Sequence, residues 1–157
     1  MKISASHLWG YIEYARIKGI DYSAILDGSG ISGKDLETPG VKMKAEAFYR
    51  AVRCIGEELG DDMLGLRVGQ HLNLNTLGVI YRISLKAKNL MECLHYCHDY
   101  LRNTFPSLSI KHSKSGNGHT FRINVADADE KVQRYVCETT LTVMSREIFY
   151  ASRGEAC

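Results

Sequence analysis

The feature that most constrains the fold is a change in the spacing of apolar residues near position 105. Before this point apolar residues recur every three or four positions, which is typical of amphipathic helices. Over 108–112 and again over 121–125 apolar and polar residues alternate, and the stretch 113–118 between them is rich in turn-forming residues. This pattern predicts a β-hairpin. Its buried face would consist of Leu108, Ile110, His112, Phe121, Ile123 and Val125.

Helical spacing and stop signals predict helices on both sides of the hairpin. Gly19 and Gly60 follow periodic stretches, where glycine commonly ends a helix. Asn89, with Glu92 three residues later, has the pattern of a capping box. The predicted helices cover residues 6–18, 21–26, 44–59, 61–72, 76–86, 90–103 and 129–152, with a short turn over 32–40. The predicted fold class is therefore α+β, with several helices packed on a small antiparallel β-sheet and a long C-terminal helix.

Two of these helices carry patterns that predict how they pack. Gly65 and Gly69 lie four residues apart and form a smooth stripe. Glycine otherwise weakens a helix by about 1 kcal/mol relative to alanine, so the stripe predicts close contact with another backbone. The last helix is apolar over a wide arc, and we expect it at the centre of the core. Its predicted buried stripe is Cys137, Leu141, Met144, Ile148 and Ala151, widened by Val132, Val136 and Val143.

A sheet of only two strands would be incomplete. An isolated hairpin is only marginally stable in water, and its open edges favour pairing with another strand. We therefore expect either a further strand, hidden in a segment interpreted above as loop or helix, or a partner chain that completes the edge.

Length, charge and cysteine usage limit the class of protein. At 157 residues the chain fits one domain, which we take to span residues 1–157. Its 20 basic and 18 acidic residues leave a net charge of +2, without the electrostatic footprint of a nucleic-acid-binding protein. The sequence has no apolar run near the roughly 20 residues that span a bilayer, and its N-terminus lacks the apolar core of a signal peptide. The odd number of cysteines suits reduced thiols, so we expect a cytoplasmic protein without membrane contact.

Five short stretches occur in an order that resembles a known family. They are GID (19–21), GSGI (28–31), GDDMLGLRVG (60–69), LGVI (77–80) and NLMECL (89–94). Together they are similar to the arabinose-binding-like N-terminal domain of AraC/XylS transcription regulators, in which a "GD-x-x-LGLR-x-G" segment precedes an "LG-x-x-G-Y" helix and a "T-L-x-E-A-L" helix. This chain departs from that pattern at Tyr81, which replaces the second glycine, and at Arg82, which replaces the tyrosine. Asn89 replaces the usual threonine cap and is chemically equivalent to it.

The resemblance implies a domain that binds a small effector and signals through homodimerisation or through a DNA-binding partner. In the family this domain normally continues into further strands and a pair of helix-turn-helix units. No segment of this sequence has the pattern of a recognition helix, so we expect no direct nucleic-acid binding by this chain. The resemblance then implies either a truncated or a free-standing sensor module.

The densest group of reactive side chains is the stretch from Cys93 to His98. Metal binding needs ligands on one helical face, but the pair Cys93 and Cys97 points to a different face from the pair His95 and His98. The two cysteines share a face with leucines and are interpreted as core. The sequence also lacks a nucleophile elbow, a phosphate loop and a dinucleotide fingerprint. We therefore predict no metal, no cofactor and no enzymatic activity.

Aromatic residues are abundant in the predicted helices, and tyrosine offers an apolar wall with a polar tip that suits a small-molecule pocket. Most such residues simply fill a core. The predicted ligand-binding residues are those with inward or flanking positions and a hydroxyl that needs a partner when buried: Tyr11, Tyr81, Tyr100 and Tyr135. The main alternative is an interaction module that binds no small molecule and acts through the open sheet edge or the C-terminal helix. A small enzyme is the third hypothesis.

Overall fold

The computed structural model describes residues 1–72, 86–116 and 118–152, and it confirms the α+β fold class. The elements in chain order are β1 (Lys2–Ser4), the 3-10 helix η1 (Ala5–Leu8), α1 (Trp9–Ile17), α2 (Ser23–Ser29), α3 (Gly33–Glu37), β2 (Lys42–Lys44), α4 (Ala45–Leu59), α5 (Leu64–His71), α7 (Leu90–Thr104), β3 (Leu108–Ser115), β4 (Gly118–Val125) and α8 (Glu130–Ser152). The predicted helix over 76–86 falls almost wholly on residues outside those described.

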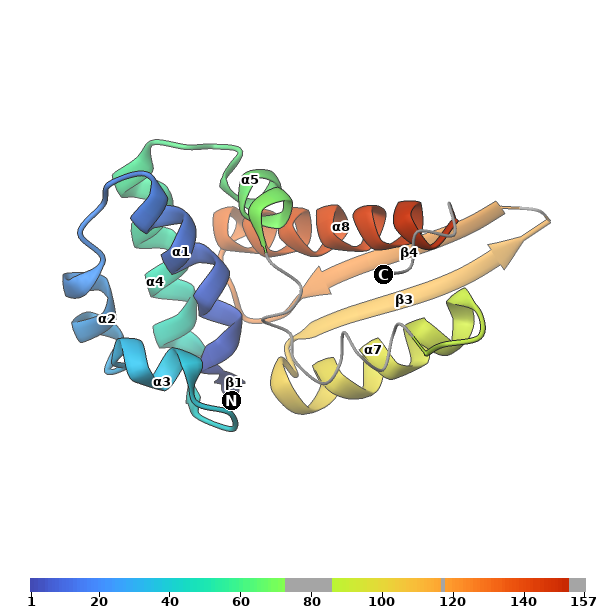
Figure 1. Cartoon of the computed structure of the whole chain (residues 1–157), viewed down its shortest axis with the longest axis horizontal. Coiled ribbons are helices and arrows are strands. Elements are labelled where there is room, and N and C mark those ends of the chain that lie inside the picture. Colours follow the sequence, from blue (N-terminus) through green and yellow to red (C-terminus); the bar gives the residue numbers. More distant parts are fainter. Residues whose placement is uncertain (73–85, 117, 153–157) are drawn as a thin grey trace.

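Helices α1 to α4 gather at one end of the molecule, and the hairpin β3–β4 extends from them toward the other end (Figure 1). Helix α7 contacts β3, helix α8 contacts β4, and α5 packs along α8. The core lies where α1, α4 and the first half of α8 meet, and its largest fully buried side chains include Tyr14, Phe48, Ile55, Val132 and Tyr135. The hairpin is thus anchored to this core at its inner end.

The predicted hairpin is confirmed in position, and the structure supplies its register. Strands β3 and β4 are antiparallel, with Leu108 opposite Val125 and Ile110 opposite Ile123. Burial falls along the hairpin, because Leu108 and Val125 are buried whereas Ile110 and Ile123 are only half-buried. The predicted apolar face is therefore covered at the inner end and only partly covered further out.

A second, smaller sheet supplies the strands that the sequence pattern did not locate. β1 and β2 are three residues each and pair in antiparallel fashion, with Ile3 opposite Met43, both buried. The sequence predicted a further strand, or a partner chain, that would complete the sheet of the hairpin, and β1 and β2 do not do so, because they form a separate sheet in the described structure.

The prediction drawn from the glycine stripe is also confirmed. A Cβ atom at Gly65 would overlap the carbonyl oxygen of Tyr135 and lie 2.7 Å from Cβ of Glu138. A Cβ atom at Gly69 would lie 2.9 Å from the carbonyl oxygen of Thr139. Both glycines therefore let the backbones of α5 and α8 approach each other closely.

Helix α8 lies at the centre of the core, and its predicted buried face is confirmed in part. Cys137 and Met144 are half-buried, and the side chains of Ile148 and Ala151 lie outside those described. Val132, Tyr135 and Val136 are buried, whereas the side chain of Leu141 is 51% exposed. The prediction for Leu141 was wrong because α5 covers the neighbouring face of α8, the one that carries Tyr135 and Thr139. Within the described residues, no helix of the structure is long and apolar enough to cross a membrane.

The helix ends carry the predicted glycine and asparagine signals, but the donor to the Glu92 carboxylate differs by one residue from the predicted capping box. Gly19 and Gly60 have positive φ angles of 78° and 56°, as expected of glycines that end helices. The Asn89 side chain accepts a hydrogen bond from the amide of Glu92 (3.0 Å). The Glu92 carboxylate, however, accepts from the amide of Lys88 (2.7 Å), one residue before the cap.

Candidate functional site

The structure brings two of the predicted ligand-binding tyrosines together, because the hydroxyl of Tyr11 donates to the carbonyl oxygen of Tyr135 (3.5 Å). The hydroxyl of Tyr11 lies 2.9 Å from Oγ1 of Thr139, and the hydroxyl of Tyr135 donates to the carbonyl oxygen of Asp61 (3.1 Å). Both side chains are buried in the core, and burial raises the pKa of Tyr11, so its phenol stays neutral. Their hydroxyls therefore have protein partners in this structure.

The other two predicted tyrosines lie elsewhere. Tyr100 is half-buried on α7, with its ring 5.7 Å from that of His7, and burial raises its pKa. Tyr81 lies outside the described residues. Contact of any of these four tyrosines with an effector stays a prediction.

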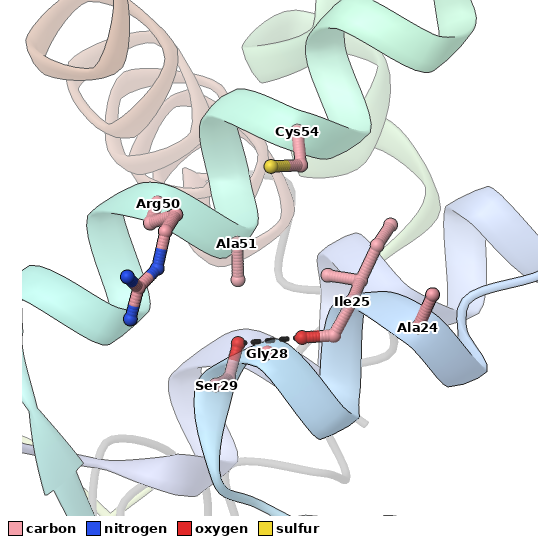
Figure 2. Close-up of a pocket in the computed structure, with 7 residues that line it drawn as sticks. All are labelled: Ala24, Ile25, Gly28, Ser29, Arg50, Ala51 and Cys54. Carbon is pink, nitrogen blue, oxygen red and sulfur yellow. Dashed lines mark hydrogen bonds between the residues drawn. The ribbon is translucent and has the colours of Figure 1, made fainter.

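A small gap lies between α2 and α4, and Figure 2 shows the side chains around it. Its volume is about 60 Å³, well below the roughly 300–1,000 Å³ of pockets for organic ligands. Ser29, on the wall of this gap, donates a hydrogen bond to the carbonyl oxygen of Ile25 (2.7 Å). The gap is lined by Ala24, Ile25, Gly28, Ser29, Arg50, Ala51 and Cys54. It is too small for an effector.

A larger hollow of about 360 Å³ lies on the polar face of the hairpin. Its volume falls within the range of small-molecule sites. Ser109 and Lys111 of β3 line it together with Arg122, Ile123 and Asn124 of β4. Side chains alternate between the faces of a strand, so the polar members of this set share the face opposite Leu108 and Ile110.

Two cations dominate the electrostatics of this hollow. Lys111 and Arg122 are direct cross-strand partners, and both are exposed. Like charges placed directly opposite each other on a sheet are destabilising. In the part of the chain that the structure describes, neither side chain forms a salt bridge. The neighbouring pair, Ser109 opposite Asn124, adds a hydroxyl and an amide that can donate hydrogen bonds.

This arrangement suits an anion. Lysine and arginine form short, charge-assisted hydrogen bonds with carboxylate and phosphate oxygens, and arginine can bind them through two parallel bonds. The lining residues contain neither a nucleophile paired with a base nor a ligand that binds metals strongly. Across the described residues, no group of three or more His, Cys, Asp or Glu side chains is placed to hold a metal ion.

The sequence prediction missed Lys111 and Arg122 because it followed the apolar face of the hairpin. The alternation over 108–112 and 121–125 that predicted the hairpin also places Lys111 and Arg122 on its polar face. Pairing Leu108 with Val125 places residue 111 opposite residue 122. Two opposed cations on an otherwise uncharged polar face would then have been apparent.

The opposite face of the hairpin carries a different polar pair near its tip. Nε2 of His112 lies 2.8 Å from Nδ1 of His119, and the two rings are stacked. Phe121 packs against His112 with ring centroids 5.0 Å apart. Each histidine is the hydrogen-bond partner of the other, and neither lines the hollow.

The fold and a comparison with known families place the chain in the class of ligand-sensing regulatory domains. The model of one family, the N-terminal arabinose-binding domain of AraC transcription regulators, matches residues 19–155. Because this match covers most of the chain, the chain belongs to that family. The family consists of regulatory ligand-binding domains and is not a family of enzymes. No curated protein matches the sequence.

Proposed function

We propose that this chain senses the effector of an AraC-type transcription regulator, and that the effector carries a carboxylate or phosphate group bound by Lys111 and Arg122. One observation carries the proposal: these two cations oppose each other across the hairpin in a hollow of ligand size. An anion between them relieves their repulsion and forms charge-assisted hydrogen bonds. A neutral ligand of the same size gains neither advantage.

Contacts at the inner end of the hairpin connect the proposed site to the rest of the domain. The hydroxyl of Tyr49 on α4 lies 2.6 Å from Oγ of Ser107, just before β3. The same hydroxyl donates to the carbonyl oxygen of Ala126 (3.0 Å), just after β4. An effector that stiffens the hairpin thereby acts on both of its connections to α4.

The output of this sensor is dimerisation or contact with a DNA-binding partner. Within the described residues, the outer edges of β3 and β4 have no strand partner. Leu141 on α8 is also exposed. Open strand edges and exposed apolar side chains are common features of protein interfaces.

Thermal unfolding in the presence of anionic and neutral probes tests the effector site. Inorganic phosphate and succinate are compared with neutral arabinose at matched ionic strength. We expect the anions to raise the Tm of the wild-type protein, because a ligand that binds only the folded state stabilises it. The double variant Lys111→Gln/Arg122→Gln should lose this response. Without ligand it should be slightly more stable, by about 0.2–1 kcal/mol, since the like-charge pair is gone.

A matched control comes from the opposite face of the same strand. Lys114→Gln removes one cation from β3 without touching the hollow and should keep the full response to anions. If arabinose alone stabilises the protein, and does so equally in the double variant, the anion site is wrong. In that case Tyr100→Phe and Tyr11→Phe test whether the effector contacts the predicted tyrosines instead.

The alternative function is an interaction module without a small ligand, which the open hairpin edges and exposed Leu141 also support. Native mass spectrometry of the protein as purified separates the two. A non-covalent small-molecule adduct supports the sensor. A dimer that carries no adduct, and whose stability none of the three probes changes, supports the interaction module.

A further inference from the structure

The outer half of the hairpin carries two histidines on one face. His112 of β3 lies opposite Phe121, and His119 of β4 lies opposite Lys114, so the two histidines are diagonal neighbours across the strands. Diagonal neighbours on one face of a sheet are within reach of each other when their side chains are long or aromatic. His112 is half-buried and His119 is exposed, so ions in solution can reach the pair.

The two imidazole rings are held together by a hydrogen bond. Nε2 of His112 lies 2.8 Å from Nδ1 of His119, and the ring planes differ by 17°. One of these nitrogens donates the hydrogen bond and the other accepts it. The ring of Phe121 packs against that of His112, with centroids 5.0 Å apart. The hairpin therefore holds two potential metal-binding nitrogens close together before any ligand arrives.

The separation of the two nitrogens matches one coordination geometry. Metal–nitrogen bonds to histidine are about 2.0 Å long, so two histidine nitrogens at right angles around a metal lie about 2.8 Å apart, whereas a tetrahedral angle would separate them by about 3.3 Å. Right-angled nitrogen ligands are typical of copper(II) and nickel(II), and imidazole suits both ions. The observed 2.8 Å therefore favours these ions over tetrahedral zinc.

We propose that His112 and His119 form a two-histidine site for a divalent transition metal of the copper(II) or nickel(II) type, with water at its remaining positions. A neutral imidazole carries its proton on either nitrogen. The proton between the rings moves to the outer nitrogen of its own ring, so both inner nitrogens present a lone pair and no proton is released. Each ring then turns about χ2, which is a broad torsion, until both lone pairs point at the metal.

The exposed histidines of α7 are arranged differently. His95 and His98 each lie beside Asp99, at 3.5 Å and 3.8 Å. Among the described residues, only His112 and His119 join one ring nitrogen to another. The proposed site has two protein ligands, which agrees with the absence of any three-ligand group in the described part of the chain. It departs from the prediction of no metal that was made from the sequence.

The metal site does not depend on the proposed effector site. The two cations of the effector site lie on the opposite face of the hairpin, because side chains alternate between the faces of a strand. The charged residue on the histidine face nearest the pair is Lys114, the cross-strand partner of His119. Lys114 is exposed, and its long flexible side chain lets the ammonium group stay away from a bound metal.

NMR of the histidine side chains during titration of the wild-type chain with nickel(II) chloride tests the proposal. Nickel(II) is the probe because the free thiols of this chain would reduce copper(II). We expect the ring signals of His112 and His119 to shift or broaden together, and at lower nickel concentration than those of His95 and His98. Magnesium chloride at the same concentration should have no effect, because magnesium prefers oxygen ligands and keeps several of its waters.

The variants His112→Gln and His119→Gln should each weaken nickel binding at the hairpin roughly tenfold or more, because the second ligand no longer acts at high effective concentration. The double variant His95→Gln/His98→Gln is the matched control and should keep the wild-type affinity. Three outcomes would overturn the proposal. They are wild-type affinity in both single variants, a response of His95 and His98 at lower nickel concentration than that of the hairpin pair, and an equal effect of magnesium.

Discussion

The ring of Tyr135 and the glycines around it show how single residues determine the packing of this domain. A Cβ atom at Gly56 would lie 2.6 Å from the Tyr135 ring, and one at Gly65 would overlap the Tyr135 carbonyl oxygen. The first contact involves a side chain, and the second involves backbone. Backbone in a packed helix cannot move away cheaply, so Gly65 is the less replaceable of the two.

Gly65→Ala should destabilise the protein by about 2–3 kcal/mol or more, because overpacking at this site pushes α5 away from α8. Gly28→Ala is the matched control. A Cβ atom at Gly28 meets nothing within 4 Å, and the residue lies inside α2, so alanine should stabilise by up to about 1 kcal/mol. Urea unfolding measures both free energies. Equal effects of the two substitutions would contradict the packing account.

His7 is a residue whose burial links stability to pH. Nε2 lies 3.0 Å from Oγ1 of Thr104, the ring packs 5.1 Å from that of Phe105, and burial lowers the pKa of His7 to about 4. In the unfolded chain the pKa of a histidine is about 6.5. Between these two values the unfolded state binds a proton that the folded state does not, so acid favours unfolding.

We therefore expect the free energy of unfolding to fall as the pH decreases from 6.5 toward 4, by at most about 1.4 kcal/mol per pH unit from His7. The variant His7→Gln should show a flatter dependence over this window. Urea unfolding at a series of pH values provides the measurement. Asp21, Asp35 and Glu92 have lowered pKa values, so their contribution is lost only at lower pH, below their unfolded range of about 4. An unchanged slope in His7→Gln would assign the pH dependence to another group.

At the scale of elements, α5 and α8 pack together more extensively than any other pair of described helices, and polar groups hold the end of α5. The guanidinium of Arg146 on α8 donates to the carbonyl oxygens of Gly69 (3.1 Å), Gln70 (2.9 Å) and Leu72 (2.7 Å). The last carbonyls of a helix have no partner within the helix. Arg146 supplies that partner from the neighbouring helix.

Arg146→Gln should lower the free energy of unfolding by about 1–3 kcal/mol, because the hydrogen bonds from the charged guanidinium to the end of α5 are lost together. Hydrogen exchange should increase most in the last turn of α5. Arg102→Gln, at an exposed position on α7, is the control and should change stability little. Faster exchange throughout α7, rather than in α5, would contradict this role of Arg146.

The elements also show what the sequence pattern could predict. The alternation over 108–125 predicted the hairpin, and the glycine spacing predicted close contact of α5 with another backbone, because both are local periodicities. The strands β1 and β2 were missed because three residues are too few for a period to show. Leu141 was wrongly assigned to the buried face of α8 because the sequence of this helix is apolar over a wide arc, and only the position of α5 decides which side is covered.

At the scale of the whole molecule, a few contacts join the N-terminal helices to the hairpin and α8. Tyr49 on α4 contacts the residues next to both strands at the inner end of the hairpin, and Arg53 on α4 forms a salt bridge with Asp129. Asp129 also caps α8 by accepting from the amide of Val132 (3.2 Å). These contacts attach α4 to the inner end of the hairpin and to the start of α8.

Tyr49→Phe should destabilise the protein by about 1–3 kcal/mol, because it leaves the buried Ser107 hydroxyl and the Ala126 carbonyl without their partner. Tyr22→Phe is the control, because Tyr22 is half-buried and its hydroxyl makes no hydrogen bond to a described residue. Differential scanning calorimetry gives the Tm of each. A loss of stability in Tyr22→Phe equal to that in Tyr49→Phe would show that the hydroxyl of Tyr49 is not the cause.

The sequence by itself determined the longer helices, the hairpin and the family, because these depend on residue periodicity, on caps and on short motifs. Tertiary structure decided which tyrosines meet, since Tyr11 and Tyr135 come together only through the packing of α1 against α5 and α8. It also decided which helix covers which face of α8. The candidate site depends both on the sequence, which supplies the two cations, and on the tertiary structure. Only the folded chain shows the register that places Lys111 opposite Arg122, and the hollow that the described residues leave beside this pair.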